Sequence, residues 1–579
     1  MVRRTASLVR TLILLTSSAC ATGPAPSPME PFDLGHLPNL DLTPQMGSRA
    51  PRSDGRHDVM LVVRTQDENE AGDPESLSLC LSEHTCLAFD STDRAWLRAG
   101  RVDHFRYDVA ESALAKMDRL SLERRSGAPR TTAWRPDCLA LIVDGELRFC
   151  RDDLALDEAR EHSASQRWAE ADIAHKGCGG CYGSPITHGP MVGRTTSTTA
   201  LIWTRAAWSL PVSVRWSLSP SMEPAQETPP VIASMIDDFV VTVRLSELEP
   251  ESRIHYQVLA DGEPVGPPRS FRTASRGASR VRIAFGSCTN AEYRPEAPIF
   301  SQVHAVIPDL FLMLGDNHYA DSTVTARLET FLRHSREDPH FADLVAATPT
   351  IATWDDHDYA GNDLYGEVPG RDETLEVFTR YWANGSYGSD GAKGVWSVQS
   401  WGDVDVFMLD TRSHRSDAAR TMLGKAQRAW LKEELLSSRA TFKVLASSSQ
   451  WTFGGSPDSW GSFPEEREAL LDFVMERQIP GVVLISGDVH RAEIRRLRAA
   501  TKGTYDIWEL TASPFNTATH ACKPDTGVDT LVLCNATTPN FGLITVDTAG
   551  STPMITLESR SVTGWSLGAV TLTLSDLTP

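Results

Sequence analysis

The chain has 579 residues, 41% of them hydrophobic, and its formal net charge is −20. This length is too great for a single hydrophobic core, so we expect roughly two to four domains. The negative charge repels nucleic-acid phosphates, which argues against a general DNA- or RNA-binding protein. The sequence has no apolar run long enough to cross a bilayer, so we do not expect the mature protein to be an integral membrane protein.

The first 20 residues have the pattern of a secretory signal, with the basic segment MVRRTASLVR followed by the short apolar segment TLILLTSSAC. Cys20 resembles the cysteine of a bacterial lipoprotein processing site, although Ser17 replaces the usual leucine. The sequence therefore predicts an exported protein, either a periplasmic, outer-membrane or cell-surface lipoprotein anchored through Cys20 or a simply secreted one. Residues 21–56 contain seven prolines and little periodicity, which predicts an extended linker.

Eight of the ten cysteines form near-neighbour pairs in the sequence. An exported protein with such pairs is predicted to contain four disulfides: Cys80/Cys86, Cys138/Cys150, Cys178/Cys181 and Cys522/Cys534. The Cys-Gly-Gly-Cys segment could instead be a redox motif or half of a zinc site. Cys288 stands alone at the end of an apolar run, so we expect it to be unpaired.

Residues 57–152 alternate in the manner of short strands, which predicts an antiparallel β-sandwich. The segments VVRTQDENEAGDPESLSLCL, GRVDHFRYDV and WRPDCLALIVDG resemble a PLAT domain, which would imply a module that docks on lipid or protein. A generic sandwich that acts as a spacer is the alternative. Residues 153–182 are predicted to form a helical connector that ends in the CGGC segment.

A second all-β unit is predicted over residues 183–275, and it resembles a fibronectin type III or immunoglobulin-like module. Tyr256 follows Leu245, Leu248 and Pro250 with the spacing of a tyrosine corner, in which the phenol bonds a nearby backbone group. We expect this unit to pack against the domain that follows.

From residue 276 to the end, apolar runs alternate with amphipathic helical segments, which predicts an α/β domain. Six apolar runs give way to polar residues, in the segments VRIAFGSC, FLMLGDNHYAD, TPTIATWDDHD, VDVFMLDTR, FKVLASSSQW and GVVLISGDVH. Because ligands bind at the carboxyl ends of strands in open α/β sheets, we expect one site at this edge.

The residues at these strand ends include many that bind metals: Cys288, Asp316, Tyr319, Asp355, Asp356, His357, Asp358, Asn362, Asp488 and His490. A buried Asp or His at one strand end is more often part of a hydrogen-bonded structure than a ligand. The repetition of such residues at consecutive strand ends favours a metal site.

The segments GSC, GDNHYAD, TWDDHDYAGND, MLDTR and SGDVH resemble the PhoD-like alkaline phosphatase and phosphodiesterase family, within the calcineurin-like metallophosphoesterase fold. The resemblance implies a four-layer α/β sandwich that hydrolyses phosphate esters with Fe³⁺ beside Ca²⁺, and the preceding fibronectin-like unit also fits the layout of that family. Together with the strand patterns before it, the predicted fold class is two all-β sandwich domains followed by this α/β four-layer sandwich. The sequence departs from the family pattern at Asn317 and His318, and His318 either adds a hydrogen bond behind the site or faces solvent.

The donor types agree with a mixed-metal site. Thiolate, phenolate and imidazole from Cys288, Tyr319 and His490 suit ferric iron, with Asp316 as a bridge to a second ion. Oxygen ligands from Asp356 and Asp488 favour Ca²⁺, or alternatively Mn²⁺ or Mg²⁺, over zinc. Further oxygens could come from Asn362, Asp358 or Gln450.

The predicted reaction is attack by a metal-activated hydroxide on a small-molecule or polymeric phosphate ester. His357 would protonate or stabilise the leaving oxygen, and Arg412 would bind a phosphate oxygen unless it forms a structural ion pair. Alternatives are a phospholipase D-like diesterase acting on lipid or cell-wall substrates, a non-catalytic surface protein whose β modules bind partners, and a thiol oxidoreductase at CGGC. A membrane surface is a further expected partner, through a lipidated Cys20 or the PLAT-like domain.

Overall fold

The computed structural model describes residues 56–65, 77–82, 85–88, 101–114, 121–124, 136–151, 181–294, 296–389, 391–452, 457–497, 504–523 and 529–579. The signal segment with Cys20, the linker before residue 56 and the connector up to residue 180 lie outside these residues, and so do the predictions made from them. Within the described part of the chain, no helix is both long enough and apolar enough to cross a membrane.

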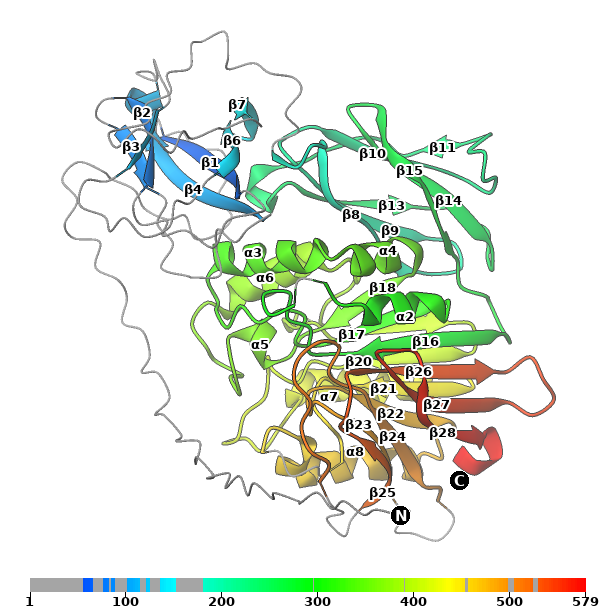
Figure 1. The fold of residues 1–579 in the computed structure, drawn as a ribbon. Helices are drawn as coiled ribbons and strands as arrows, with labels where there is room; N and C mark the ends of the chain where they lie inside the picture. The colour runs from blue at the N-terminus through cyan, green and yellow to red at the C-terminus, as the bar shows by residue number, and fades with distance from the viewer. Residues whose placement is uncertain are drawn as a thin grey trace, which may run out of the picture. The chain divides into compact units, whose positions relative to one another are not determined.

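The amino-terminal region forms two antiparallel sheets, ordered β4-β1-β6-β7 and β3-β2-β5 (Figure 1). Its elements are β1 (Arg56–Thr65), β2 (Leu77–Ser82), β3 (Thr85–Ala88), β4 (Val102–Ala110), α1 (Glu111–Leu114), β5 (Ser121–Arg124), β6 (Pro136–Val143) and β7 (Glu146–Arg151). The described residues of this region form strands and one helical turn, as the alternation over residues 57–152 predicts. Its resemblance to a PLAT domain stays a prediction.

Two of the predicted disulfide pairings are wrong. Cys138 is bonded to Cys181 and not to Cys150, because the β6–β7 register places Cys150 opposite Ala140, two residues away from Cys138. The Cys138–Cys181 bond also excludes the pairing of Cys181 with Cys178 and a CGGC dithiol centre. Cys150 is disulfide-bonded as well.

The other cysteine predictions have different outcomes. The Cys522–Cys534 disulfide and the free, buried Cys288 are confirmed. Cys80 and Cys86 are opposite each other in the β2–β3 ladder, but their side chains lie outside what the structure describes.

Residues 186–272 form a two-sheet β-sandwich with sheets ordered β13-β9-β8 and β11-β10-β14-β15, and β12 also pairs with β10. The elements are β8 (Ile186–Thr195), β9 (Ala200–Ala206), β10 (Pro211–Ser217), β11 (Gln226–Glu227), β12 (Val231–Ile232), η4 (Met235–Asp237), β13 (Val240–Leu245), β14 (Arg253–Ala260) and β15 (Glu263–Arg272). One buried cluster joins both sheets to the amino-terminal region, from Val62 and Ile142 to Ile202 and Val214.

The predicted tyrosine corner is not formed in the expected way. The Tyr256 hydroxyl donates to the carbonyl oxygen of Ala346 at 2.8 Å, in the α/β domain, and not to a nearby backbone group. Asp238, next to η4, likewise accepts from Arg333 in that domain at 2.7 Å. Both contacts attach the sandwich to the domain that follows, as expected for its packing role.

The α/β domain has a six-stranded sheet ordered β18-β17-β16-β26-β27-β28 and a seven-stranded sheet ordered β19-β20-β21-β22-β24-β23-β25. The first comprises β16 (Arg280–Gly286), β17 (Leu310–Leu314), β18 (Thr350–Thr353), β26 (Asn540–Asp547), β27 (Met554–Ser561) and β28 (Ser566–Thr573). The second comprises β19 (Ser397–Trp401), β20 (Val404–Met408), β21 (Phe442–Ala446), β22 (Val482–Ser486), β23 (Ala492–Leu497), β24 (Ile507–Thr511) and β25 (Asp529–Asn535).

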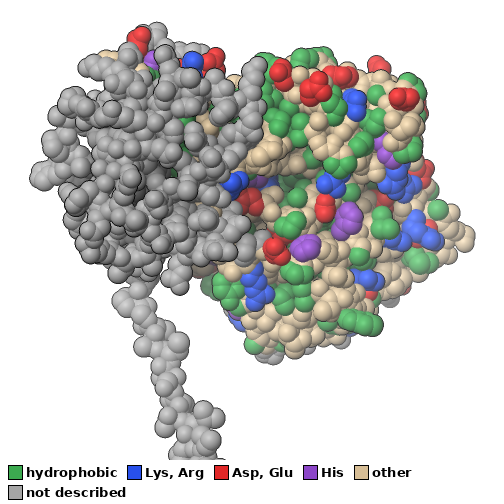
Figure 2. All heavy atoms as spheres, turned by 45° about the horizontal axis from the view of Figure 1, so that its top comes forward, with side chains coloured by type: hydrophobic (Ala, Val, Ile, Leu, Met, Phe, Trp, Pro, Cys, Tyr) green, Lys and Arg blue, Asp and Glu red, His purple; other side chains and the backbone are tan. Residues whose placement is uncertain are grey.

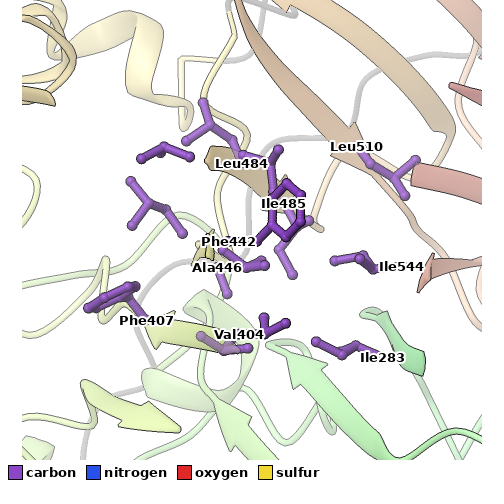
Figure 3. Close-up of a cluster of buried hydrophobic side chains, with 14 of the residues drawn as sticks. Ile283, Val404, Phe407, Phe442, Ala446, Leu484, Ile485, Leu510 and Ile544 are labelled. Carbon is purple, nitrogen blue, oxygen red and sulfur yellow. The ribbon is translucent and has the colours of Figure 1, made fainter. Parts of the chain in front are cut away.

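The two sheets pack face to face through a core of aliphatic and aromatic side chains, among them Ile283, Ile544, Val404, Phe442 and Ile485 (Figure 3). Helices cover the outer faces, which gives four layers (Figure 1). The helices are α2 (Ile299–Ala305), α3 (Thr325–Arg336), α4 (Pro339–Ala347), α5 (Asp356–Tyr359), α6 (Arg371–Tyr381), α7 (Gly424–Ser437) and α8 (Pro464–Glu476), with 3-10 turns η5 (Trp460–Ser462) and η6 (Leu574–Leu577).

The topology explains why one site forms. Strands β16, β17 and β18 run parallel in one sheet, and β20, β21 and β22 run parallel in the other. The loops after these strands meet across the two sheets, since the Thr353 hydroxyl donates to the carbonyl oxygen of Leu409 at 2.7 Å. The carboxyl ends of six strands therefore lie at one edge of the core, as the sequence predicts.

Candidate metal centre

Four predicted ligands lie on turns just after strands and have left-handed backbone conformations. The φ angles of Cys288, Asp316, Asp488 and His490 are 62°, 49°, 64° and 54°. This region costs a non-glycine residue on the order of 1–3 kcal/mol and is concentrated at functional sites. Gly315 has a φ of 97°, and a Cβ there would lie 2.5 Å from the Cβ of Asp355. The turn after β17 therefore requires glycine.

Asp316 Oδ2 is the atom on which the first group converges. The Cys288 thiol donates to it at 3.3 Å, and the Tyr319 hydroxyl donates to it at 3.1 Å. The ligand atoms of Cys288, Asp316 and His490 all lie within 4.8 Å of one another. These four side chains are thus close enough to bind a single ion.

His490 is held as a neutral imidazole with one nitrogen available. Its Nδ1 lies 2.7 Å from the carbonyl oxygen of Ala518, and because a carbonyl only accepts, Nδ1 carries the proton and Nε2 keeps its lone pair. The Thr517 hydroxyl lies 3.5 Å from Nε2, a long contact that an ion would replace. Burial, followed by the charge of His520, lowers the pKa of His490 to about 4. A backbone acceptor on the second nitrogen is typical of histidines that bind metals.

A second group adjoins the first. Asp316, Asp356 and His357 also have ligand atoms within 4.8 Å of one another, so Asp316 belongs to both groups. His357 Nδ1 lies 2.5 Å from Asp321 Oδ1, and its ring lies against that of Tyr319 with centroids 4.2 Å apart. Burial lowers the pKa of His357, but the hydrogen bond to Asp321 and the nearby carboxylates outweigh it, so the pKa is raised.

Two predicted ligands lie outside these groups. The carboxylate of Asp488 belongs to neither, although its backbone carbonyl accepts from the Cys288 thiol at 3.6 Å. Asn362 is exposed, and its amide donates to Asp363 at 2.9 Å. Their roles as ligands stay predictions.

Arg412 is fully buried and ion-paired. Its Nε donates to Asp355 Oδ1 at 2.5 Å and its Nη1 donates to Asp458 Oδ1 at 3.0 Å. Its second terminal nitrogen also pairs with both carboxylates. To bind a phosphate oxygen, the guanidinium would have to exchange one of these partners. Phosphate binding by Arg412 stays a prediction.

Comparisons with known proteins agree with this geometry. Residues 283–563 match the family model described as PhoD-like phosphatase, and residues 181–275 match the model described as its N-terminal domain. The chain belongs to the PhoD-like phosphatase family. The amino-terminal sheets lie outside both matches.

Alkaline phosphatase D of Bacillus subtilis is 26% identical over 381 residues, which is 53% of this chain and 64% of the relative. The match thus spans slightly less than two thirds of that relative. A solved structure of PhoD has a TM-score of 0.55 at 19% identity and covers 66% of this chain and 88% of its own. A purple acid phosphatase from yellow lupin seeds has a TM-score of 0.53 at 11% identity and covers 89% and 90%. These likenesses confirm the predicted fold class.

The side chains of this PhoD-like site fit cations. Burial, followed by the carboxylates of Asp356, Asp355 and Asp358, raises the pKa of Asp316 well above its usual value. Burial and neighbouring carboxylates do the same for Asp488. Asp316 Oδ1 is buried without a hydrogen-bond partner. Because buried carboxylates that repel one another need compensating positive charge, bound cations would supply what these residues require.

Sequence reasoning missed three acidic residues at this site. Asp363 and Asp458 form a third group with Asp356, and Asp321 holds His357. Asp321 and Asp363 are the last residues of the quoted segments GDNHYAD and TWDDHDYAGND, so proximity in sequence could have found them. Asp458 follows no apolar run, and nothing local marks it.

The structure shows which contacts His318, Asp358 and Gln450 make. His318 is buried, and its Nε2 lies 3.6 Å from Asp358 Oδ1, behind the site and away from solvent. Burial lowers its pKa to about 3. Asp358 accepts backbone N–H groups of Asn317 and Asp355, both at 2.9 Å, and the amide of Gln450 donates to Glu493 at 2.7 Å. Asp358 therefore braces the two turns that carry the site.

Proposed function

We propose that the protein is an exported, metal-dependent phosphoric ester hydrolase of the alkaline phosphatase and phosphodiesterase type. The observation that carries this proposal is the convergence of a thiol and a phenol on one buried carboxylate oxygen, Asp316 Oδ2, with a neutral imidazole beside them. Burying these polar groups together costs free energy, and without a bound ligand they do not stabilise the core. The PhoD-like family membership supports the same reaction class.

Two different metal ions suit the two groups of residues that share Asp316. Fe³⁺ would be held by Cys288, Tyr319, His490 and Asp316, since ferric iron favours phenolate and thiolate. Ca²⁺, or alternatively Mn²⁺ or Mg²⁺, would be held by Asp316 with the oxygens of Asp356, Asp488 and Asn362. Bound there, the cations would supply Lewis acidity that activates a water and neutralises charge on the phosphoryl oxygens.

The residues of the chain have separate tasks in this proposal. His357, held through Nδ1 by Asp321, presents Nε2 as the proton donor to the leaving oxygen. Arg412 has the charge to bind a phosphate oxygen if it exchanges Asp355 or Asp458, and otherwise it keeps those carboxylates in place.

The substrate experiment compares the purified, metal-restored protein on nitrophenyl phosphate and on bis-nitrophenyl phosphate. We expect hydrolysis of at least one ester, and the ratio of kcat/KM values separates monoester from diester preference. Activity confined to the diester, extended to phospholipids or cell-wall polymers, would identify a phospholipase D-like diesterase. Absence of both activities would favour a non-catalytic binding protein.

Tyr319→Phe tests the assignment of iron. The wild-type protein should show a visible tyrosinate-to-iron(III) charge-transfer band, and the variant should lose it because the phenolate oxygen is gone. Phe keeps the ring that packs against His357, so the fold should be retained. Stoichiometric zinc without a visible band in the wild-type protein would contradict the proposed ligand set.

Export and surface attachment complete the proposal. Structural disulfides are typical of oxidising compartments, and the two described in full support secretion or a periplasmic, outer-membrane or cell-surface location. Basic, acidic and histidine side chains lie interspersed on the described part of the face in Figure 2. The proposed partner is a small-molecule or polymeric phosphate ester, as the PhoD-like family match suggests.

A further inference from the structure

The loop at residues 512–523, which follows β24, contacts two of the proposed metal ligands, Cys288 and His490. The Ser513 hydroxyl donates to the Cys288 sulfur at 3.1 Å, and the Asn516 N–H donates to the Cys288 carbonyl at 3.4 Å. Both loop residues are buried. The first half of the loop is thus fixed by packing and fixes Cys288.

The second half of the loop contacts His490. The Ala518 carbonyl accepts from His490 Nδ1 at 2.7 Å, and the His520 N–H donates to the His490 carbonyl at 2.8 Å. The rings of His490 and His520 are stacked, with centroids 4.5 Å apart and an angle of 25° between their planes. The orientation of the His490 ring therefore depends on where this half of the loop lies.

Burial does not hold this second half in place. Ala518, His520 and every described residue from there to residue 523 are exposed. The covalent tie is Cys522, which is bonded to Cys534. Cys534 lies in β25 and pairs in register with Glu493 of β23, three residues after His490. His490 is thus followed directly by β23, β23 pairs with β25, and the disulfide joins β25 to the loop segment that contacts the His490 ring.

We propose that the Cys522–Cys534 disulfide is a positioning element for His490, which keeps Ala518 and His520 against the ring so that Nε2 faces Cys288 and Asp316. This inference rests on the proposed function, because it treats His490 as a metal ligand. It gives the disulfide a task at the metal centre besides the general restriction of the unfolded chain.

The test compares metal retention in the full-length, iron-loaded wild-type protein and in Cys522→Ser/Cys534→Ser. Outer partners of metal-binding histidines change metal affinity by about 10–100-fold when they are lost, so we expect EDTA to remove iron from the variant at a correspondingly lower concentration. The visible band should fade in parallel. The matched control is Cys138→Ser/Cys181→Ser, which removes the other fully described disulfide and should lower the melting temperature without changing iron retention.

A second pair of variants keeps the disulfide intact. His520→Ala removes the stacked ring and should weaken iron retention, whereas His520→Phe keeps a flat ring and should restore it. If the double serine variant does not fold, the iron retention of these two His520 variants tests whether the loop positions His490. A folded double serine variant, or His520→Ala, that retains iron as the wild-type protein does would overturn the inference alone. A wild-type protein that binds no metal would instead overturn the proposed function and this inference with it.

Discussion

Asp316→Asn should remove the metals and lower kcat/KM by roughly 10³-fold, the upper end of what loss of one charge-stabilising group costs. Asp316 is the residue common to the group with Cys288 and His490 and the group with Asp356 and His357. Asn keeps the shape of the side chain but loses the negative charge, and its NH₂ group cannot accept from the Cys288 thiol or the Tyr319 hydroxyl. Metal analysis and rates on the better of the two nitrophenyl esters measure the effect.

The matched control for this variant is Asp338→Asn. Asp338 is buried and caps α4 by accepting the N–H of His340 at 2.8 Å, while its other oxygen accepts the N–H of Ala297 at 2.7 Å. Asn is an equally good cap, but its NH₂ group cannot accept from Ala297, so the control also loses one buried acceptor, outside the groups that contain Asp316. We expect the control to keep its metals and most of its activity. If Asp316→Asn instead retains both metals and more than about a tenth of the activity, where the loss of a single oxyanion-hole donor already costs about 10²–10³, then Asp316 does not bridge two ions.

His357→Asn should lower kcat by about 10²–10⁴-fold on phosphate esters with poor leaving groups, such as phenyl or alkyl esters. The expected loss is smaller on nitrophenyl esters, because a good leaving group departs without a proton. The geometry supports this role, since Asp321 fixes Nδ1 at 2.5 Å and leaves Nε2 as the second nitrogen. Paired rates on the two classes of ester measure the effect.

Two further measurements separate proton donation from metal binding. His357 also belongs to the group with Asp316 and Asp356, so metal content of the variant must equal that of the wild-type protein for the assignment to hold. Asp321→Asn should produce the same leaving-group pattern with a smaller loss, because the ring is then less firmly oriented. Equal losses on both classes of ester would mean that His357 is not the proton donor.

Much of the site could be predicted because its signals are local. Each apolar run must form a buried strand, and the residues that follow it must lie at the sheet edge, so Cys288, Asp316, Tyr319, Asp356 and His490 could be placed near one another from their positions alone. The fold class followed from the same alternation of strands and helices. The distances and the strained turns could not be predicted, since they depend on how two sheets meet.

The sequence by itself determined the order of the domains' secondary structure, the chemistry present at the strand ends and the solitary state of Cys288. These properties depend on apolar periodicity and on residue type, which act within a few neighbouring residues. Only the tertiary structure decided that Cys138 pairs with Cys181, that Tyr256 bonds α4, that Asp458 joins Arg412 and that the disulfide-tied loop faces His490. Each of these contacts joins segments whose approach depends on strand register and domain packing, and no local pattern encodes that approach.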